Sequence, residues 1–274
     1  MSTNNDFGIK GKVAVLTGGA GVLCSAMAIS LGKAGAKVVL LDIGEDAMQR
    51  LGRQLEQDGI EYLAVKTDVL DKGSIEQAAE KAIAKFGKID ILINGAGGNK
   101  PTATTGPDKS FFNLPEDAVK WVFDLNFMGT FLACQVFGRY FADQKEGNII
   151  NVSSMNAITP LTKIPAYSAA KAAVSNFTQW LAVHMSQNYS TDIRVNGIAP
   201  GFLLTDQNRF LLTNEKDGSL TERGQTIIAH TPSGRFGKPE DLVSTIDWLV
   251  SPSSKFVHGI VVPIDGGFSA FSGV

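Results

Sequence analysis

The sequence contains few cysteines and histidines, and neither set is spaced like a metal site. Its two cysteines, Cys24 and Cys134, are far apart and form no CxxC pair. The three histidines, His184, His230 and His258, share no ligand spacing either, so no metal site is predicted. Cys24 would stand at a helix N-terminus, where the pKa of a thiol can fall. We interpret it instead as a small residue packed between a helix and a strand.

The charge and hydropathy patterns argue against two further classes of protein. The formal net charge is −2 and there is no basic tail, which argues against nucleic acid as a main partner. No apolar run approaches the roughly 18 residues needed to span a membrane. The opening MSTNNDFGIKGK is polar and lacks the apolar core of a signal peptide. These features predict a cytoplasmic protein with no membrane partner.

Short β-branched runs alternate with helical patterns along nearly the whole chain. Most of these runs are apolar throughout, as expected for strands buried on both faces of a parallel sheet. The alternation predicts an α/β fold: one domain, residues 1–274, built on a Rossmann-type doubly wound parallel sheet of about seven strands with helices on both faces. Strands are expected at 12–16, 37–41, 62–66, 90–94, 148–152, 193–199 and 259–264, and helices beginning near Gly21, Glu45, Gly73, Pro115, Ala166 and Pro239.

Two long segments interrupt this alternation. Residues 95–114, rich in Gly, Thr and Pro, follow the fourth strand, and residues 200–238 follow the sixth. Both leave the carboxyl ends of strands, the edge where open α/β sheets bind ligands. Loops this long in a compact domain are more often functional than idle. We predict that both contribute to a substrate site.

The turn TGGAGVLC, residues 17–24, is typical of a dinucleotide site or of a plain strand-to-helix turn. It opens a helix, whose N-terminus supplies free N–H groups and partial positive charge for a pyrophosphate. About 20 residues on, Asp42 ends the next strand, where a carboxylate can accept both hydroxyls of an adenosine ribose and would repel a 2′-phosphate. No Lys or Arg stands in the turn or beside Asp42. The sequence therefore favours NAD over NADP as the cofactor.

The segment YSAAK places Tyr167 and Lys171 four residues apart, on one face if the segment is helical. A free tyrosine has a pKa near 10, and an adjacent ammonium would lower it enough for general acid/base catalysis. Ser153 and Ser154 end the preceding strand, and a hydroxyl there could hold a substrate oxygen beside the phenol. A Tyr/Lys pair on a helix surface is the alternative.

Together these motifs resemble the short-chain dehydrogenase/reductase family, in its single-domain branch, over essentially the whole chain. The chain departs from the family's pattern in three places. Val22 and Cys24 replace two glycines of its TGxxxGxG turn, and Gly95 replaces the second asparagine of its NNAG motif. The matching pieces, in the family's order and spacing, are TGGAG, Asp42, Asp68-Val69, NGAG at 94–97, Asn126 in DLNFMGTF, NVSS, YSAAK, RVNGIAPG and VVPIDGGF.

The resemblance implies a role for each matching residue. Tyr167 is the acid/base that exchanges a proton with the substrate oxygen, and Lys171 lowers its pKa and holds the nicotinamide ribose. Ser154 binds the same substrate oxygen, and Asn126 positions a water that relays protons. The resemblance also implies a homo-oligomer, a dimer or tetramer. The implied cofactor-binding residues are Gly18, Gly19, Gly21, Leu23, Asp42, Ile43, Asp68, Val69, Asn94, Ala96, Gly97, Tyr167, Lys171, Pro200, Gly201 and Thr205.

Within the family, the loops resemble the D-mannonate oxidoreductases (fructuronate reductases), which interconvert D-mannonate and D-fructuronate with NAD(H). A sugar acid needs a cation for its carboxylate and several hydrogen-bonding groups for its hydroxyls. Lys163 is the first candidate for the carboxylate. The full set of candidate substrate residues is Asn99, Lys100, Asn156, Lys163, Gln207, Asn208 and Arg209.

Two alternatives stay open. The first is a reductase or dehydrogenase for another polyol, a keto-sugar or a 3-oxoacyl substrate. The polar segment 206–209 and Lys163 argue against the acyl substrate, whose pocket should be mostly apolar. The second is a catalytically silent dinucleotide-binding regulator. Such proteins usually lose the Tyr or the Lys, whereas all four implied catalytic residues are present here.

Overall fold

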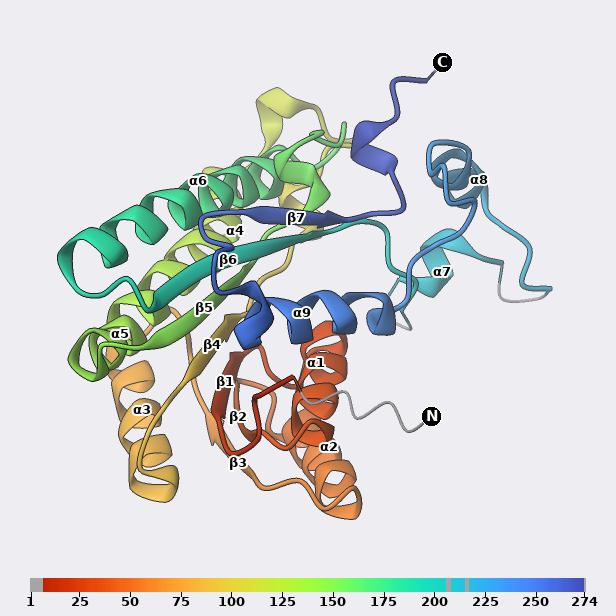
Figure 1. The fold of residues 1–274 in the computed structure, drawn as a ribbon. Helices are drawn as coiled ribbons and strands as arrows, with labels where there is room; N and C mark the ends of the chain where they lie inside the picture. The colour runs from red at the N-terminus through yellow and green to blue at the C-terminus, as the bar shows by residue number, and fades with distance from the viewer. Residues whose placement is uncertain (1–6, 206–207, 215–216, 274) are drawn as a thin grey trace.

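The chain folds around one seven-stranded parallel sheet, which the computed structural model describes over residues 7–205, 208–214 and 217–273 (Figure 1). The strand order is β3-β2-β1-β4-β5-β6-β7, and every neighbouring pair is parallel. This confirms the predicted doubly wound sheet. The strands, each within two residues of its predicted bounds, are β1 (Val13–Thr17), β2 (Lys37–Asp42), β3 (Tyr62–Lys66), β4 (Ile91–Asn94), β5 (Gly147–Val152), β6 (Ile193–Pro200) and β7 (Val261–Ile264).

Helices cover both faces of the sheet because the central strands are apolar along their length. On β1, Leu16 packs under one group of helices and Val15 under the other, since successive strand side chains point to opposite faces. Within the described ranges, no helix has the length and apolar character needed to cross a membrane. One face carries α1 (Val22–Lys33), α2 (Glu45–Gln57) and α9 (Val243–Val250), and the other α3 (Lys72–Phe86), α5 (Gly129–Gln144) and α6 (Pro165–Asn188) (Figure 1).

The order of the strands reverses at β1, and this reversal creates a place for a ligand. The chain leaves β1 through α1 and α2 to build β2 and β3, and then returns through α3 to place β4 on the other side of β1. The loops at the carboxyl ends of β1 and β4 therefore diverge to opposite faces and leave a crevice between them. Thr17 pairs with Asn94, so both loops begin at the same level.

Both predicted substrate loops contain short helices. Residues 95–114 include the 3-10 helices η1 (Pro101–Ala103) and η2 (Phe111–Asn113), and residues 200–238 include α7 (Arg209–Leu212) and α8 (Glu222–Ala229). The second loop is closed at its base. The Leu204 N–H donates to the Gly237 carbonyl at 2.8 Å, and the Gly237 N–H donates to the Phe202 carbonyl at 2.9 Å. The loop therefore returns to the point where it leaves the sheet.

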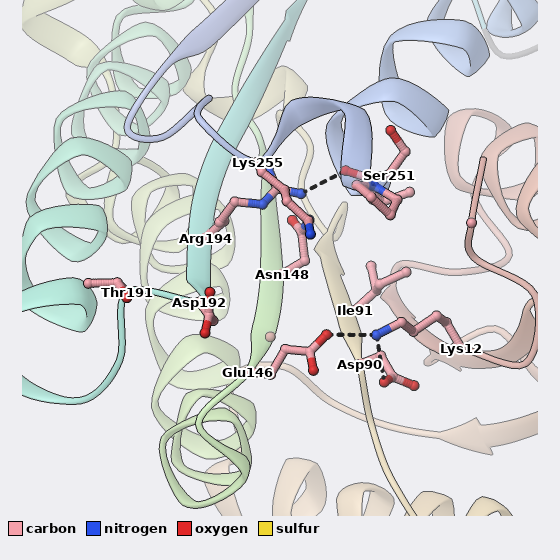
Figure 2. Close-up of a pocket in the computed structure, with 14 residues that line it drawn as sticks. Lys12, Asp90, Ile91, Glu146, Asn148, Thr191, Asp192, Arg194, Ser251 and Lys255 are labelled. Atoms are coloured by element: carbon pink, nitrogen blue, oxygen red, sulfur yellow. Dashed lines mark hydrogen bonds and ion pairs between the residues drawn. The ribbon is translucent and has the colours of Figure 1, made fainter.

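A charged cleft lies at the opposite, amino-terminal edge of the sheet (Figure 2). Arg194 of β6 and Asn148 of β5 are register partners in its wall. Both donate to the Leu249 carbonyl at the end of α9, at 2.8 and 3.0 Å. Arg194 also donates to the carbonyls of Ser251 at 3.3 Å and Ser254 at 3.0 Å. The buried guanidinium thus places a cation at a helix C-terminus and anchors α9 to the sheet.

We expect Arg194→Met to lower the free energy of unfolding by about 2–4 kcal/mol, because the carbonyls at the end of α9 lose a charged donor. Urea unfolding measures this change. Lys255→Met is the matched control: Lys255 lines the same cleft but is exposed, so its replacement should change stability by less than about 0.5 kcal/mol. Equal losses in the two variants would show that Arg194 contributes no more than a surface cation.

Candidate active site

A cleft of about 320 Å³ lies at the carboxyl edge of the sheet, where β1 and β4 meet. Its lining includes residues that were not predicted from the sequence, among them Phe202 and Leu203. Their position directly after Pro200-Gly201 could have indicated that they line the site. The cleft brings together the expected catalytic residues Ser154, Tyr167 and Lys171, the expected cofactor residues Gly18, Gly21, Leu23, Gly97, Pro200, Gly201 and Thr205, and one expected substrate residue, Asn208.

Other expected site residues do not line this cleft. Gln207 lies outside the described residues. Of the described residues expected in the site, those that the cleft lining does not include are Asn126, Gly19, Asp42, Ile43, Asp68, Val69, Asn94, Ala96, Asn99, Lys100, Asn156, Lys163 and Arg209.

The Gly-rich turn needs glycine for close packing. Gly18 has a φ of +60°, and a Cβ there would lie 2.8 Å from the Cα of Ala96. A Cβ on Gly19 would lie 2.8 Å from the Leu16 carbonyl oxygen. Val22 is the first residue of α1, a helical conformation open to any L-residue, and the preceding Gly21 offers no side-chain cap. The first amide groups of α1 therefore face the cleft without a side-chain partner at the cap, an arrangement that fits a pyrophosphate.

Asp42 is held at the end of β2, next to this turn. Its Oδ2 accepts the N–H of Ala20 at 3.1 Å, and its Oδ1 accepts the N–H of Gly44 at 2.9 Å. Two backbone amides therefore fix the carboxylate beside the Gly-rich turn. This position fits an acceptor for ribose hydroxyls.

Both cysteines are buried, and their burial makes the thiols unreactive. Burial raises the pKa of Cys24 and of Cys134 to about 12. This direction is opposite to the effect of a helix N-terminus, because the desolvation of the thiolate dominates. Cys24 is therefore a packed residue, as interpreted from the sequence.

We expect an aromatic disulfide reagent at mildly alkaline pH to label neither thiol of the folded protein within minutes. The thiols are shielded and held protonated, and reaction with a disulfide requires the thiolate. Both should react in concentrated guanidinium chloride, which serves as the control for reagent and stoichiometry. Rapid labelling of either thiol in the native protein would contradict the burial argument.

Tyr167 and Lys171 lie on the first turns of α6, with Pro165 at its first position. Lys171 is 4% exposed and its Nζ donates to the Val152 carbonyl at 2.8 Å. Burial lowers the pKa of Lys171 to about 8. Nζ lies 5.6 Å from the centroid of the Tyr167 ring.

The pKa of Tyr167 differs from the sequence expectation. Burial raises it, and a hydrogen bond with Ser154 only partly opposes the rise. The sequence predicts that Lys171 lowers this pKa. In the folded protein the desolvation of the phenolate outweighs any such effect. The phenol of Tyr167 therefore keeps its proton at neutral pH, beside the hydroxyl of Ser154.

Asn126 lies behind the cleft on a π-helical turn, η3 (Asp124–Met128), that joins α4 (Glu116–Phe123) to α5. Such turns occur frequently at functional sites. Its Nδ2 donates to the carbonyls of Gly98 and Val122, both at 2.7 Å. A Cβ on Gly97 would lie 2.6 Å from Oδ1 of Asn126 and 3.2 Å from Nζ of Lys171. The amide and the ammonium therefore both flank Gly97, and glycine keeps the space between them open.

Three residues expected to contact the cofactor have side chains in other roles. Asn94 is 1% exposed, and its Nδ2 donates to Oδ1 of Asn151 at 2.8 Å, so this side chain joins β4 to β5. Asp68 is exposed, and its Oδ1 accepts the N–H of Leu70 at 2.9 Å. Val69 is buried. The side chain of Asn94 is thus used to join two strands, and that of Val69 is buried.

Two expected substrate residues on the first loop are engaged elsewhere. Asn99 donates to Thr104 Oγ1 at 2.8 Å. Nζ of Lys100 lies 3.8 Å from the centroid of a Trp121 ring. Both side chains therefore stabilise the segment 95–114 or its contact with α4.

Lys163 was expected in the substrate site, but it does not line the cleft. Its side chain is exposed, and its carbonyl accepts the Thr105 N–H at 2.9 Å, so its backbone is used to join two loops. Asn208 does line the cleft, but its Oδ1 accepts the Thr205 N–H and its Nδ2 donates to the Leu203 carbonyl, both at 2.8 Å. Asn156 is buried, and its Oδ1 has no partner among the described residues.

A family model described as short chain dehydrogenase matches residues 12–216. The chain belongs to the short-chain dehydrogenase/reductase family. One relative, the uncharacterized oxidoreductase UxuB of Bacillus subtilis, is 51% identical over 97% of this chain and 98% of its own length. The protein is therefore an oxidoreductase of this family.

Two relatives have solved structures with a nicotinamide cofactor. The crystal structure of a proposed D-mannonate oxidoreductase from Haemophilus influenzae, with bound NAD, is 44% identical, covers 99% of this chain and 100% of its own, and has a TM-score of 0.92. A 7α-hydroxysteroid dehydrogenase of Escherichia coli is 30% identical over 97% of this chain and 98% of its own. A structure of 7α-hydroxysteroid dehydrogenase with NADH and 7-oxo glycochenodeoxycholic acid has a TM-score of 0.85.

Proposed function

We propose that this oxidoreductase uses NAD(H) to interconvert D-mannonate, a secondary alcohol, and D-fructuronate, the corresponding ketone. The observation that carries the proposal is the single cleft in which the Gly-rich turn meets Ser154, Tyr167 and Lys171. The 44% identity with the NAD-bound Haemophilus influenzae protein supports both the cofactor and the substrate.

The preference for NAD over NADP rests on Asp42. Its carboxylate is fixed by two backbone amides beside the turn, and a 2′-phosphate placed there would meet a negative charge. The amide groups at the start of α1 would bind the pyrophosphate. Lys171 would hold the nicotinamide ribose at the other end of the cleft.

NAD(H), when bound, supplies or accepts the hydride at the carbinol carbon. Tyr167, which keeps its proton at neutral pH, donates that proton to the ketone oxygen in the direction of reduction. Ser154 holds the same oxygen beside the phenol. Lys171 is fixed by the Val152 carbonyl and Asn126 by the backbone of Gly98, so the site is positioned before the substrate enters.

The substrate carboxylate must find its cation outside the lining of the cleft. Lys171 is the one Lys or Arg among the described lining residues, and it is buried against Val152. The loops 95–114 and 200–238 carry Lys100 and Arg209, and Lys163 lies between β5 and α6. We propose that a cation from these segments binds the carboxylate when substrate is present.

Steady-state oxidation of NADH, with NADPH in parallel, tests the proposal on D-fructuronate, D-tagaturonate and neutral ketoses. Rapid turnover only with D-fructuronate and NADH is the expected result. Turnover of neutral ketoses but not of the uronates would remove the sugar acid and keep the reaction type. Equal rates with NADPH would overturn the role of Asp42.

We also propose a homo-oligomer. Trp180 and Val183, both 55% exposed, lie on α6. Trp180 lines a groove together with Phe131 of α5 and Phe177 of α6, and Val183 lies on the same helix. Light scattering during size-exclusion chromatography tests this, and a monomeric mass at micromolar concentration would contradict it.

A further inference from the structure

Two departures from the family's sequence pattern meet in space. Cys24 lies in the first turn of α1, and Gly95 directly follows β4. A Cβ built on Gly95 would lie 2.1 Å from the sulfur of Cys24, closer than any real contact of a Cβ, and 3.1 Å from the Thr17 carbonyl oxygen. A side chain at residue 95 therefore requires the Cys24 sulfur to leave its present position.

The backbone does not explain the glycine at 95. Gly95 is not among the described glycines with positive φ, so its conformation is open to other residues. The severe overlap is with the neighbouring thiol at 2.1 Å, whereas the Thr17 carbonyl oxygen at 3.1 Å makes only a tight contact. Cys24 is therefore the main reason that residue 95 is glycine.

The thiol is well packed in this position. Cys24 is 3% exposed, and its Sγ donates to the Thr17 carbonyl at 3.6 Å. The same carbonyl accepts the N–H of Gly95 at 3.2 Å. One carbonyl at the end of β1 thus joins the helix that opens at the Gly-rich turn to the loop that leaves β4. Both Cys24 and Gly95 line the cleft.

We infer that residues 24 and 95 share one side-chain volume, and that Cys24 is a positioning residue for the cofactor turn. The family's pattern has glycine at position 24 and asparagine at position 95, whereas this chain has cysteine at 24 and glycine at 95. The side chain has thus moved from position 95 to position 24, and the two departures are one compensating change. The thiol in this volume sets how closely α1 approaches β4, and with it the width of the cleft between their ends.

The inference is tested with Gly95→Ala, Cys24→Gly and the double variant. Gly98→Ala is the matched control, because Gly98 lines the same cleft but a Cβ there would meet nothing within 4 Å. Without cofactor, Gly95→Ala should lower Tm by about 5 °C or more through overpacking, and Gly98→Ala by less than about 2 °C. Adding Cys24→Gly should return Gly95→Ala to within about 2 °C of Cys24→Gly alone.

The positioning role is read from NADH binding, by fluorescence, at a temperature where every variant is folded. This readout rests on the proposed cofactor. Gly95→Ala should raise the dissociation constant about tenfold, and the double variant should recover most of that loss. If Gly95→Ala does not fold, recovery of folding in the double variant is the supporting result. Additive losses in the double variant, or an unchanged Gly95→Ala, would overturn the inference.

The two proposals fail separately. No sugar substrate enters these measurements, so inactivity on D-fructuronate leaves them unaffected. If the wild type does not bind NADH, the proposed cofactor fails, while the Tm comparison still decides whether residues 24 and 95 share one volume.

Discussion

Replacing Tyr167 with phenylalanine is expected to lower kcat by about 10²–10⁴-fold, the usual contribution of a positioned general acid or base. Phenylalanine keeps the ring but removes the hydroxyl that hydrogen-bonds with Ser154 and carries the proton. The dissociation constant of NADH should change by less than about threefold, because the Gly-rich turn and Asp42 are untouched. Stopped-flow turnover and NADH fluorescence measure the two effects.

Tyr189→Phe is the control for this variant. Tyr189 is 45% exposed at the end of α6, so the loss of its hydroxyl should leave kcat unchanged. A Tyr167→Phe protein that retains turnover within tenfold of the wild type would remove Tyr167 from the proton transfer. Loss of NADH binding together with turnover would instead assign Tyr167 to the cofactor site.

Replacing Asp42 with alanine is expected to weaken NADH binding by about 10–100-fold, since hydrogen bonds to a charged group contribute about 1.5–3 kcal/mol. NADPH should gain relative to NADH because the charge that repels the 2′-phosphate is gone. The ratio of kcat/KM for the two cofactors is the measurement. A ratio that does not move would show that another group selects the cofactor.

Asp42→Asn separates two effects of this change. Asp42 also accepts the N–H of Ala20 and so helps to hold the Gly-rich turn. Asparagine removes the charge and keeps one acceptor oxygen, which can accept the N–H of Ala20 but not that of Gly44 as well. If cofactor preference follows charge, Asp42→Asn and Asp42→Ala should relax it alike, whereas Asp42→Ala should disturb the turn more than Asp42→Asn. Asp46→Ala, on the exposed first turn of α2, should change neither quantity.

Much of the fold could be predicted because its signals are local. Apolar runs such as VAVLT in β1 and KVVLLD in β2 predict strands buried on both faces, and the structure has them within a residue of the expected bounds. The helical segments between them predict the crossovers of a parallel sheet. The short helices α7 and α8 were not predicted, because α7 has four residues and α8 eight, too few to produce a clear period.

The candidate site was predictable where a residue type and its place at a strand end coincide. Asp42 at the end of β2 and Ser154 after β5 are of this kind, and Tyr167 was predictable from its helical spacing to Lys171. Lys163 was not, since its distance along the chain from Tyr167 says nothing about the direction in which its side chain leaves the loop. Side-chain direction outside regular elements depends on contacts with other segments, here the bond between Lys163 and Thr105.

By itself the sequence determined the order of strands and helices, the chemistry of the residues at the strand ends and the family to which the chain belongs. Periodicity and motif spacing are properties of neighbours along the chain, so they can be read without a structure. Only the tertiary structure decided that burial raises the pKa of Tyr167, that the Asn94 side chain is hydrogen-bonded to Asn151 of β5, and that the sulfur of Cys24 occupies the place of a side chain at Gly95. Burial and steric exclusion arise between segments far apart in sequence, and only folding brings those segments together.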